Sequence, residues 1–100
     1  MGWLIAYDIA DAKRWRKVYH LVRSVGFRLQ YSLFWADIDA QTAHKLADEL
    51  KSIIDPKADD IRFYPLDDDD EVLLAGPKPW PEGTMHAAAR RFDRCWRDVP

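Results

Sequence analysis

Apolar and polar positions in the first quarter of the chain predict a buried strand followed by an amphipathic helix. The apolar run from Trp3 to Tyr7 ends in Asp8, which is typical of a central strand. Asp11 is a suitable N-cap for the next helix, and Gly26 is expected to end that helix. One side of it carries the apolar stripe Trp15, Val18, Val22 and Val25, and the other carries Lys13, Arg16, Lys17, His20 and Arg23.

The middle of the chain predicts two more strands, a second helix and a further strand. Aromatic and β-branched residues dominate 27–38, which indicates two strands, or one long bent strand, with a break near 30–32. Asp39 is a suitable cap for a helix whose apolar positions 43, 46, 47, 50, 53 and 54 follow helical spacing up to Asp55-Pro56. The alternation in 60–66 predicts a strand with Ile61 and Phe63 on one face.

This order predicts an α+β fold, a ferredoxin-like βαββαβ sandwich with both helices on one face of the sheet, over residues 1–76. The other face is expected to stay uncovered and to need a partner. Residues 71–75 predict an extra C-terminal strand. Residues 77–100 predict a proline-containing linker and a tail helix that Thr84 caps. The face of this helix would carry Met85, Ala88, Ala89, Phe92 and Trp96, and these added elements are expected to reach a neighbouring subunit.

Composition and charge narrow the possible partners. The chain has 100 residues, 48% of them apolar, and a net charge of −2. A core of this size is small, so pairing with a second copy would add useful burial. The charge is segregated: residues 11–30 hold six basic and one acidic residue, whereas 55–71 hold eight acidic and two basic. A local basic field can steer a polyanion, although ordinary solvated faces would also produce this pattern.

Several classes of protein are excluded or disfavoured. No apolar run approaches the ~20 residues that span a membrane. The opening residues lack the basic start of a signal peptide, so we expect a cytoplasmic protein. Cys95 is the single cysteine, which excludes a disulfide framework. His20, His44 and His86 lack the spacing of a zinc site.

Asp8 is the sharpest candidate for chemistry. A carboxylate where a central strand meets solvent could hold Mg²⁺ or Mn²⁺ and bring the ion to a phosphate. A two-fold axis placing Asp8 of two subunits together would strengthen this thin site. From the residues alone, a turn or capping aspartate after a strand is the more common interpretation. The cluster Lys13, Arg14, Arg16 and Lys17 could likewise clamp phosphates or form a solvated helix face.

Three segments together resemble one known family. They are Ile5-Ala6-Tyr7-Asp8-Ile9 with Asp11, the helix start Lys13-Arg14-Trp15-Arg16-Lys17, and Gly26-Phe27-Arg28-Leu29-Gln30-Tyr31-Ser32-Leu33-Phe34. With 60–66 added, the chain resembles the CRISPR-associated protein two family over residues 1–76. The resemblance implies a ferredoxin-like homodimer that bridges the CRISPR integrase and holds double-stranded DNA during spacer acquisition.

The resemblance also assigns roles to individual residues. Family members are described as metal-dependent endonucleases on RNA or DNA, which makes Asp8 the catalytic metal ligand, with Mg²⁺ or Mn²⁺ at the dimer interface. It implies nucleic-acid contacts by Arg14, Arg16, Lys17 and Arg28, with Tyr7 and Phe34 in support. Trp15 stands where the family often has arginine. Three hypotheses follow: an adaptor in spacer integration, which we favour, a metal-dependent phosphodiesterase, and a stand-alone toxin-like endoribonuclease acting on single-stranded RNA.

Overall fold

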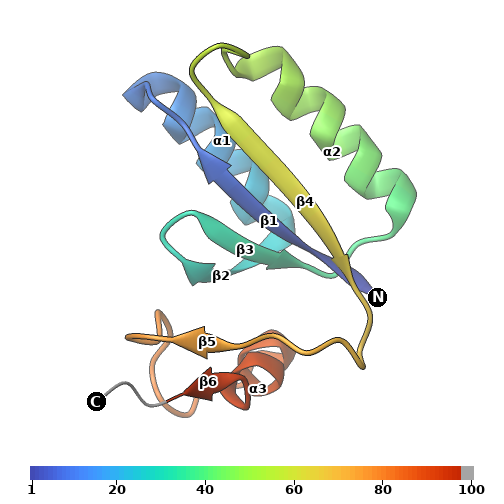
Figure 1. Ribbon diagram of the computed structural model, residues 1–100, viewed down its shortest axis with the longest axis vertical. Coiled ribbons are helices and arrows are strands. Elements are labelled where there is room, and N and C mark those ends of the chain that lie inside the picture. Colours follow the sequence, from blue (N-terminus) through green and yellow to red (C-terminus); the bar gives the residue numbers. More distant parts are fainter. Residues whose placement is uncertain (98–100) are drawn as a thin grey trace.

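The computed structural model describes residues 1–97 and contains a four-stranded antiparallel sheet in the order β2-β3-β1-β4. Its elements are β1 (Gly2–Asp8), α1 (Ala12–Val25), β2 (Gly26–Gln30), β3 (Leu33–Ala36), α2 (Ala40–Ile53), β4 (Asp60–Leu66), β5 (Leu74–Ala75), α3 (Ala87–Asp93) and β6 (Trp96–Arg97). Helices α1 and α2 cover one face of the sheet (Figure 1). The predicted ferredoxin-like α+β fold is therefore confirmed. Within residues 1–97, every helix falls short of the length and apolar character that crossing a bilayer requires.

Both long helices begin at the predicted caps. The Asp11 carboxylate accepts a hydrogen bond from the Arg14 backbone N–H at 3.0 Å, and the Asp39 carboxylate accepts one from the Thr42 N–H at 2.7 Å. These bonds satisfy backbone donors that a helix start leaves free. Helix α1 ends at Gly26, as predicted, but this glycine is extended (φ −127°) and starts β2. Glycine suits this position because there is little room for a side chain: a Cβ atom there would lie only 3.1 Å from the Val22 carbonyl oxygen.

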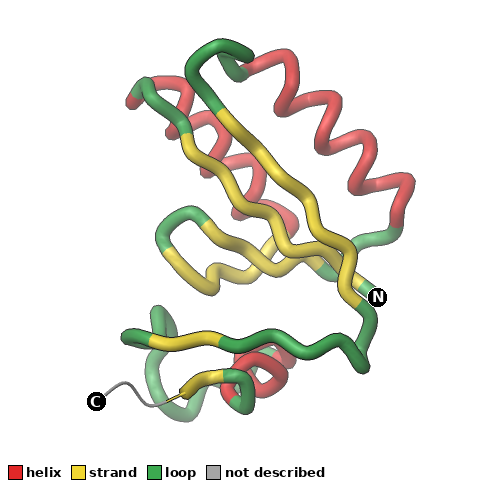
Figure 2. The backbone as a smooth tube through the Cα atoms, viewed as in Figure 1, coloured by secondary structure: helices red, strands yellow, loops and turns green. Residues whose placement is uncertain are grey.

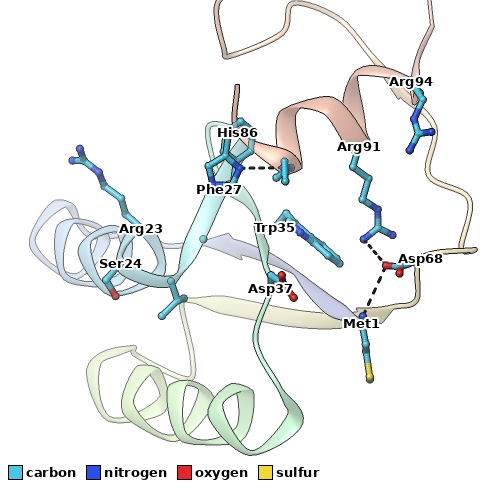
Figure 3. A pocket seen from close by; sticks show the side chains of 14 residues that line it. Met1, Arg23, Ser24, Phe27, Trp35, Asp37, Asp68, His86, Arg91 and Arg94 are labelled. Carbon is cyan, nitrogen blue, oxygen red and sulfur yellow. Dashed lines mark hydrogen bonds and ion pairs between the residues drawn. The ribbon is translucent and has the colours of Figure 1, made fainter. Parts of the chain in front are cut away.

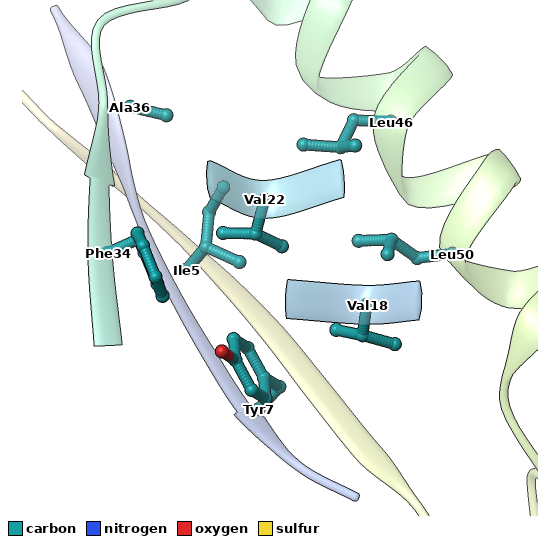
Figure 4. Packing of buried hydrophobic residues seen from close by; sticks show 8 residues of the cluster. All are labelled: Ile5, Tyr7, Val18, Val22, Phe34, Ala36, Leu46 and Leu50. Carbon is teal, nitrogen blue, oxygen red and sulfur yellow. The ribbon is translucent and has the colours of Figure 1, made fainter. Parts of the chain in front are cut away.

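The main core lies between the sheet and the two long helices (Figure 4). Ile5 and Phe34 from the sheet meet Val18 and Val22 from α1 and Leu50 from α2, and all five are almost completely buried. Burying one such side chain stabilises the fold by roughly 1.5–3 kcal/mol. This layer fixes the position of α1 relative to the end of β1, where Asp8 lies.

The predicted break near 30–32 is the turn of a β-hairpin. Strands β2 and β3 pair on either side of it, with a register irregularity between Arg28 and Gln30. The backbone N–H of Tyr7 donates to the carbonyl oxygen of Ser32 at 3.1 Å, which brings the hairpin tip beside the end of β1. Two segments distant in sequence therefore meet at one end of the sheet.

The outer face of the sheet is only half open, which corrects the expectation that it stays uncovered. On β2 and β3, the outward side chains of Leu29 and Trp35 are buried against Ala88 and Phe92 of α3. The Trp35 and Phe92 rings meet edge to face at 5.3 Å. The chain's own C-terminal segment thus covers this half, because its large apolar side chains would otherwise face water (Figure 1).

The other half of the outer face, along β1 and β4, stays partly accessible, although Leu4 and Leu66 pack against the cluster that includes α3. Its outward positions pair across the two strands as Ala6 with Arg62 and Leu4 with Tyr64. Arg62 is exposed, and 45% of the surface of Tyr64 is accessible to solvent. This half is the surface on which a partner could still pack.

The C-terminal elements differ in detail from the prediction. Strand β5 has two residues and pairs in parallel with β6 in a separate sheet (Figure 2). Thr84 does not cap the helix, because its hydroxyl donates to the Pro81 carbonyl oxygen at 2.6 Å. His86 caps α3 instead, by accepting the Ala88 N–H at 3.0 Å. Met85 is 78% exposed and Trp96 lies in β6, so neither belongs to a buried helix face. Residues 98–100 of the predicted tail lie outside the described residues.

Candidate functional site

Asp8 is the last residue of β1 and is exposed to solvent. Side chains alternate along a strand, and Ile5 and Tyr7 point into the helix-side core. Asp8 therefore lies on the opposite, outer face. It pairs in register with Asp60, the first residue of β4. Two carboxylates thus flank the end of the sheet, and one Asp60 oxygen accepts the Arg62 Nε–H at 2.9 Å.

The sequence analysis did not single out Asp60. Its position next to Asp8 follows from the way in which the two strands pair, not from a local sequence pattern. Pairing 60–66 antiparallel to the first strand places the first residue of one beside the last residue of the other. Residues 60 and 8 are therefore neighbours in any sheet that pairs these two strands in this register.

The donor set at this edge suits a hard cation only in part. Residues 1–97 contain no group of three or more histidine, cysteine, aspartate or glutamate side chains that could hold a metal ion. Mg²⁺ often binds through one or two carboxylates and keeps several water ligands. The exposed Asp8 carboxylate fits that chemistry as one ligand with Asp60 as its register neighbour, and a carboxylate from another copy would add a further ligand.

Arg14 does not lie free on the basic helix face, contrary to the expectation for a phosphate ligand. Its Nε donates to one oxygen of Asp59 at 2.8 Å and its Nη2 donates to the other at 3.3 Å. The Asp59 side chain is completely enclosed and also accepts the backbone N–H groups of Ala10 and Asp55, both at 2.9 Å. The Arg14 guanidinium, as the largest influence, holds the pKa of Asp59 far below its usual range. Arg14 therefore joins the start of α1 to the loop before β4.

The remaining predicted cations are exposed around this edge. Arg16 and Lys17 lie on α1, and Arg28 lies on β2 near the hairpin tip. The Arg28 guanidinium carbon is 5.6 Å from the centre of the Tyr31 ring, a cation–π contact. These side chains keep their charges available to a polyanion.

The two predicted supporting residues, Tyr7 and Phe34, lie in the core behind this end of the sheet. The Tyr7 and Phe34 rings stack at 6.2 Å, and both side chains are buried. The Tyr7 hydroxyl has no hydrogen-bond partner among the described residues. Burial, with a contribution from the neighbouring Tyr19, raises the pKa of Tyr7 to about 12. Tyr7 is therefore a neutral phenol whose hydroxyl is left without a bond.

Trp15 packs against the main core, as its place in the apolar stripe predicts, and it also belongs to an aromatic stack near Tyr7 that the sequence pattern did not reveal. We call Trp15, Tyr19 and Tyr31 the aromatic stack. The Trp15 ring lies 5.0 Å from Tyr19 and 5.3 Å from Tyr31, with interplanar angles of 9° and 19°. The spacing of Trp15 and Tyr19 by four residues was the available signal, because such residues are neighbours on a helix surface.

A separate cavity of about 770 Å³ lies at the other end of the sheet, between the end of α1, the start of β2 and α3 (Figure 3). Arg23, Arg91 and Arg94 contribute to its lining, with Asp37 and Asp68. Arg91 sits over the Trp35 ring at 4.4 Å and donates to the Asp67 carbonyl oxygen at 2.8 Å. The cavity is distant from Asp8 because Gly26 and Ala36 pair level with Trp3, at the start of β1.

Comparison with known proteins places this geometry in a family. Residues 1–72 match the family described as CRISPR associated protein Cas2. A CRISPR-associated endoribonuclease Cas2 of Chloroflexus aurantiacus is 45% identical over 64 residues, 64% of this chain and 69% of the relative. A CRISPR-associated endonuclease Cas2 of Thermus thermophilus is 36% identical over 75 residues, 75% of this chain and 83% of the relative.

Solved structures agree with this assignment. The crystal structure of Streptococcus pyogenes Cas2 matches with a TM-score of 0.64 and 34% identity, covering 69% of this chain and 89% of the other. A hypothetical protein from Thermus thermophilus matches with a TM-score of 0.70 and 32% identity, covering 81% of this chain and 96% of the other.

Proposed function

Because the chain belongs to the Cas2 family of CRISPR-associated proteins, we propose that it is an adaptor in spacer acquisition. In this role a homodimer of the chain bridges subunits of the CRISPR integrase and holds double-stranded DNA. The observation that carries the proposal is that the chain has two different surfaces, one suited to binding a polyanion and one open to a second copy. One is the exposed basic face of α1 with Arg28, and the other is the open outer face of β1 and β4.

The open half of the outer face supports the homodimer. Ala6 and Tyr64 lie on it outside both apolar clusters, whereas Leu4 packs against the cluster that includes Ala88 and Phe92 of α3. Pairing this half with that of a second copy would remove apolar surface from water. The C-terminal segment occupies the other half, which leaves β1 and β4 as the part of the face open to a second copy.

The exposed cations support binding to the phosphate backbone rather than to base sequence. Arg16 and Lys17 project from α1, and Arg28 projects from the neighbouring hairpin. Among residues 1–97, the order of elements matches none of the common motifs that place a helix in the groove of duplex DNA to read bases. Binding through phosphates is insensitive to sequence and falls steeply with salt.

Metal-dependent endonuclease activity is the second candidate, and its endonuclease part is favoured by the relatives' names, endoribonuclease and endonuclease. Asp8, paired with the Asp8 of a second copy, would hold Mg²⁺ or Mn²⁺, which when bound polarises a phosphate and activates water. The chain's own contribution is to place the Asp8 carboxylate at the strand end and to hold the strand through the contacts of β1 with β3 and β4. A stand-alone toxin-like ribonuclease has no observation in its favour beyond the shared fold.

The test is spacer acquisition in cells that carry a CRISPR array and the integrase but lack this chain. Complementation with wild type should restore new spacers, and so should Asp8→Asn if the adaptor function needs no cleavage. The double variant Arg16→Ala with Lys17→Ala should reduce acquisition at least tenfold. Lys45→Ala with Lys51→Ala on α2 is the matched control, because it removes the same charge from a different helix. Wild-type rates of acquisition without the chain would refute the adaptor function.

A further inference from the structure

The aromatic stack ends in a ring that faces solvent. Trp15 and Tyr19 are partly buried on α1, whereas Tyr31 at the hairpin tip keeps 61% of its surface exposed. The Tyr31 ring is nearly parallel to Trp15, with an interplanar angle of 19°. An exposed turn tyrosine would ordinarily be mobile, but here its plane is held by the ring beneath it. A flat aromatic surface is therefore presented to solvent in a defined orientation.

Positive charge surrounds this surface. Arg28 lies over Tyr31 at 5.6 Å, and Arg23 lies over Tyr19 at 5.9 Å. The exposed Lys13, Arg16 and Lys17 extend the positive charge along α1. Sites that bind single-stranded nucleic acid combine these two parts, since bases stack on aromatic rings while cations follow the phosphates. Stacking on Tyr31 would also keep Arg28 close to the base plane.

The buried hydroxyl of Tyr7 lies near the aromatic stack. Tyr7 is 4% exposed, its hydroxyl has no partner among residues 1–97, and it lies within electrostatic reach of Tyr19, Arg28 and Tyr31. Figure 4 shows this hydroxyl pointing away from α2, towards the side of β3. This hydroxyl is enclosed by protein, so a ligand on this surface would contact the exposed Tyr31 ring and the cations instead.

We propose that Tyr31, supported by Trp15, is a stacking platform for an unpaired nucleobase of a single strand of RNA or DNA. The phosphates of that strand contact the basic face of α1. The inference rests on the proposed binding of nucleic acid at this end of the sheet, and it adds the residues that would contact an unpaired base. A duplex cannot use the platform in the same way, because its bases are already stacked on one another. Frayed ends and overhangs can.

The test measures the binding of fluorescein-labelled 12-nucleotide oligouridylate, oligothymidylate and a blunt 12-base-pair duplex by anisotropy at one low salt concentration. Tyr31→Ala should weaken binding of both single strands about tenfold, in line with the contribution of one stacked base. Duplex binding should change by less than about twofold. Tyr31→Phe is the matched control, because it keeps the ring and should bind like wild type. Circular dichroism of each variant checks that the exposed turn substitution leaves the fold intact.

Photo-crosslinking gives a second readout that does not depend on affinity. An oligonucleotide with 4-thiouridine at each position in turn should crosslink to Tyr31 or Trp15, as located by mass spectrometry. Equal single-strand binding by wild type and Tyr31→Ala would overturn the inference, and so would crosslinks confined to other residues. If wild type binds the duplex but no single strand, the platform is refuted while the proposed function stands. If it binds neither, both fail.

Discussion

The guanidinium of Arg14 and the enclosed carboxylate of Asp59 form a two-bond ion pair that ties the start of α1 to the loop preceding β4. The Nε–Oδ2 and Nη2–Oδ1 distances are 2.8 and 3.3 Å. The same carboxylate accepts the backbone N–H of Ala10, in the loop that leaves β1. Three segments are thereby joined directly beside Asp8. This pair sets where the basic face of α1 lies relative to the end of the central strand.

Asp59→Asn should lower the thermal unfolding midpoint by more than about 5 °C, because it leaves the Arg14 cation without its partner. Differential scanning calorimetry at pH 7 measures the change. Asp48→Asn on the exposed side of α2 is the control and should have little effect. An unchanged midpoint would show that the pair contributes nothing to stability.

The same pair predicts acid sensitivity. The pKa of Asp59 in the folded chain lies below its unfolded value of about 3.9, mainly because of Arg14. Its contribution to stability is thus complete above pH ~4 and is lost as pH falls towards the folded pKa. Thermal melts of wild type should decline through this window more steeply than melts of Asp59→Asn. Parallel pH profiles for the two proteins would contradict this assignment.

Tyr64→Asp should dissociate the proposed homodimer, because it places a charge in the open half of the outer face. Sedimentation velocity at micromolar concentration should show dimeric wild type and a variant whose dissociation constant is at least tenfold higher. Met85→Asp, at an exposed position away from β1 and β4, should remain dimeric. Monomeric wild type at this concentration would refute the dimer itself.

Arg16→Ala with Lys17→Ala should weaken binding to unrelated duplex sequences by the same factor. Each lost phosphate contact should reduce the slope of log affinity against log salt by about 0.9. Titrations at several salt concentrations measure both quantities, with Lys45→Ala and Lys51→Ala as the charge-matched control. Arg14 is left intact because its replacement would disturb the Asp59 pair. Sequence-dependent losses would contradict the phosphate assignment.

Asp8→Asn should remove any nuclease activity while preserving nucleic-acid binding, because it deletes a metal ligand without altering side-chain shape. Cleavage of labelled RNA and duplex DNA, with Mg²⁺ or Mn²⁺ and with EDTA, measures the effect. Asp37→Asn, an exposed aspartate at the other end of the sheet, should cleave like wild type. Cleavage that survives both Asp8→Asn and EDTA would assign the activity to another site or to a contaminant.

Local chemistry made much of this fold predictable. Asp11 and Asp39 cap the two long helices as expected, since capping depends on residues three positions apart. The alternation of Ile61 and Phe63 with Arg62 and Tyr64 likewise matches their burial. The family resemblance also depends only on short segments and on their order along the chain. None of these features requires knowing which distant residues meet.

The order of the elements, their caps and the segregation of charge follow from the amino-acid sequence alone, because these features depend on neighbours along the chain. Tertiary structure decided which charges stay available and which surfaces stay open. In the sequence Asp59 is one of several acids in an acidic segment, and only the folded loops enclose it against Arg14. Trp15 lies in the predicted core stripe, but only the folded hairpin brings Tyr31 against its ring. Likewise, whether α3 would cover its own sheet or a neighbour's depended on contacts such as Trp35 with Phe92, which are 57 residues apart and leave no local pattern.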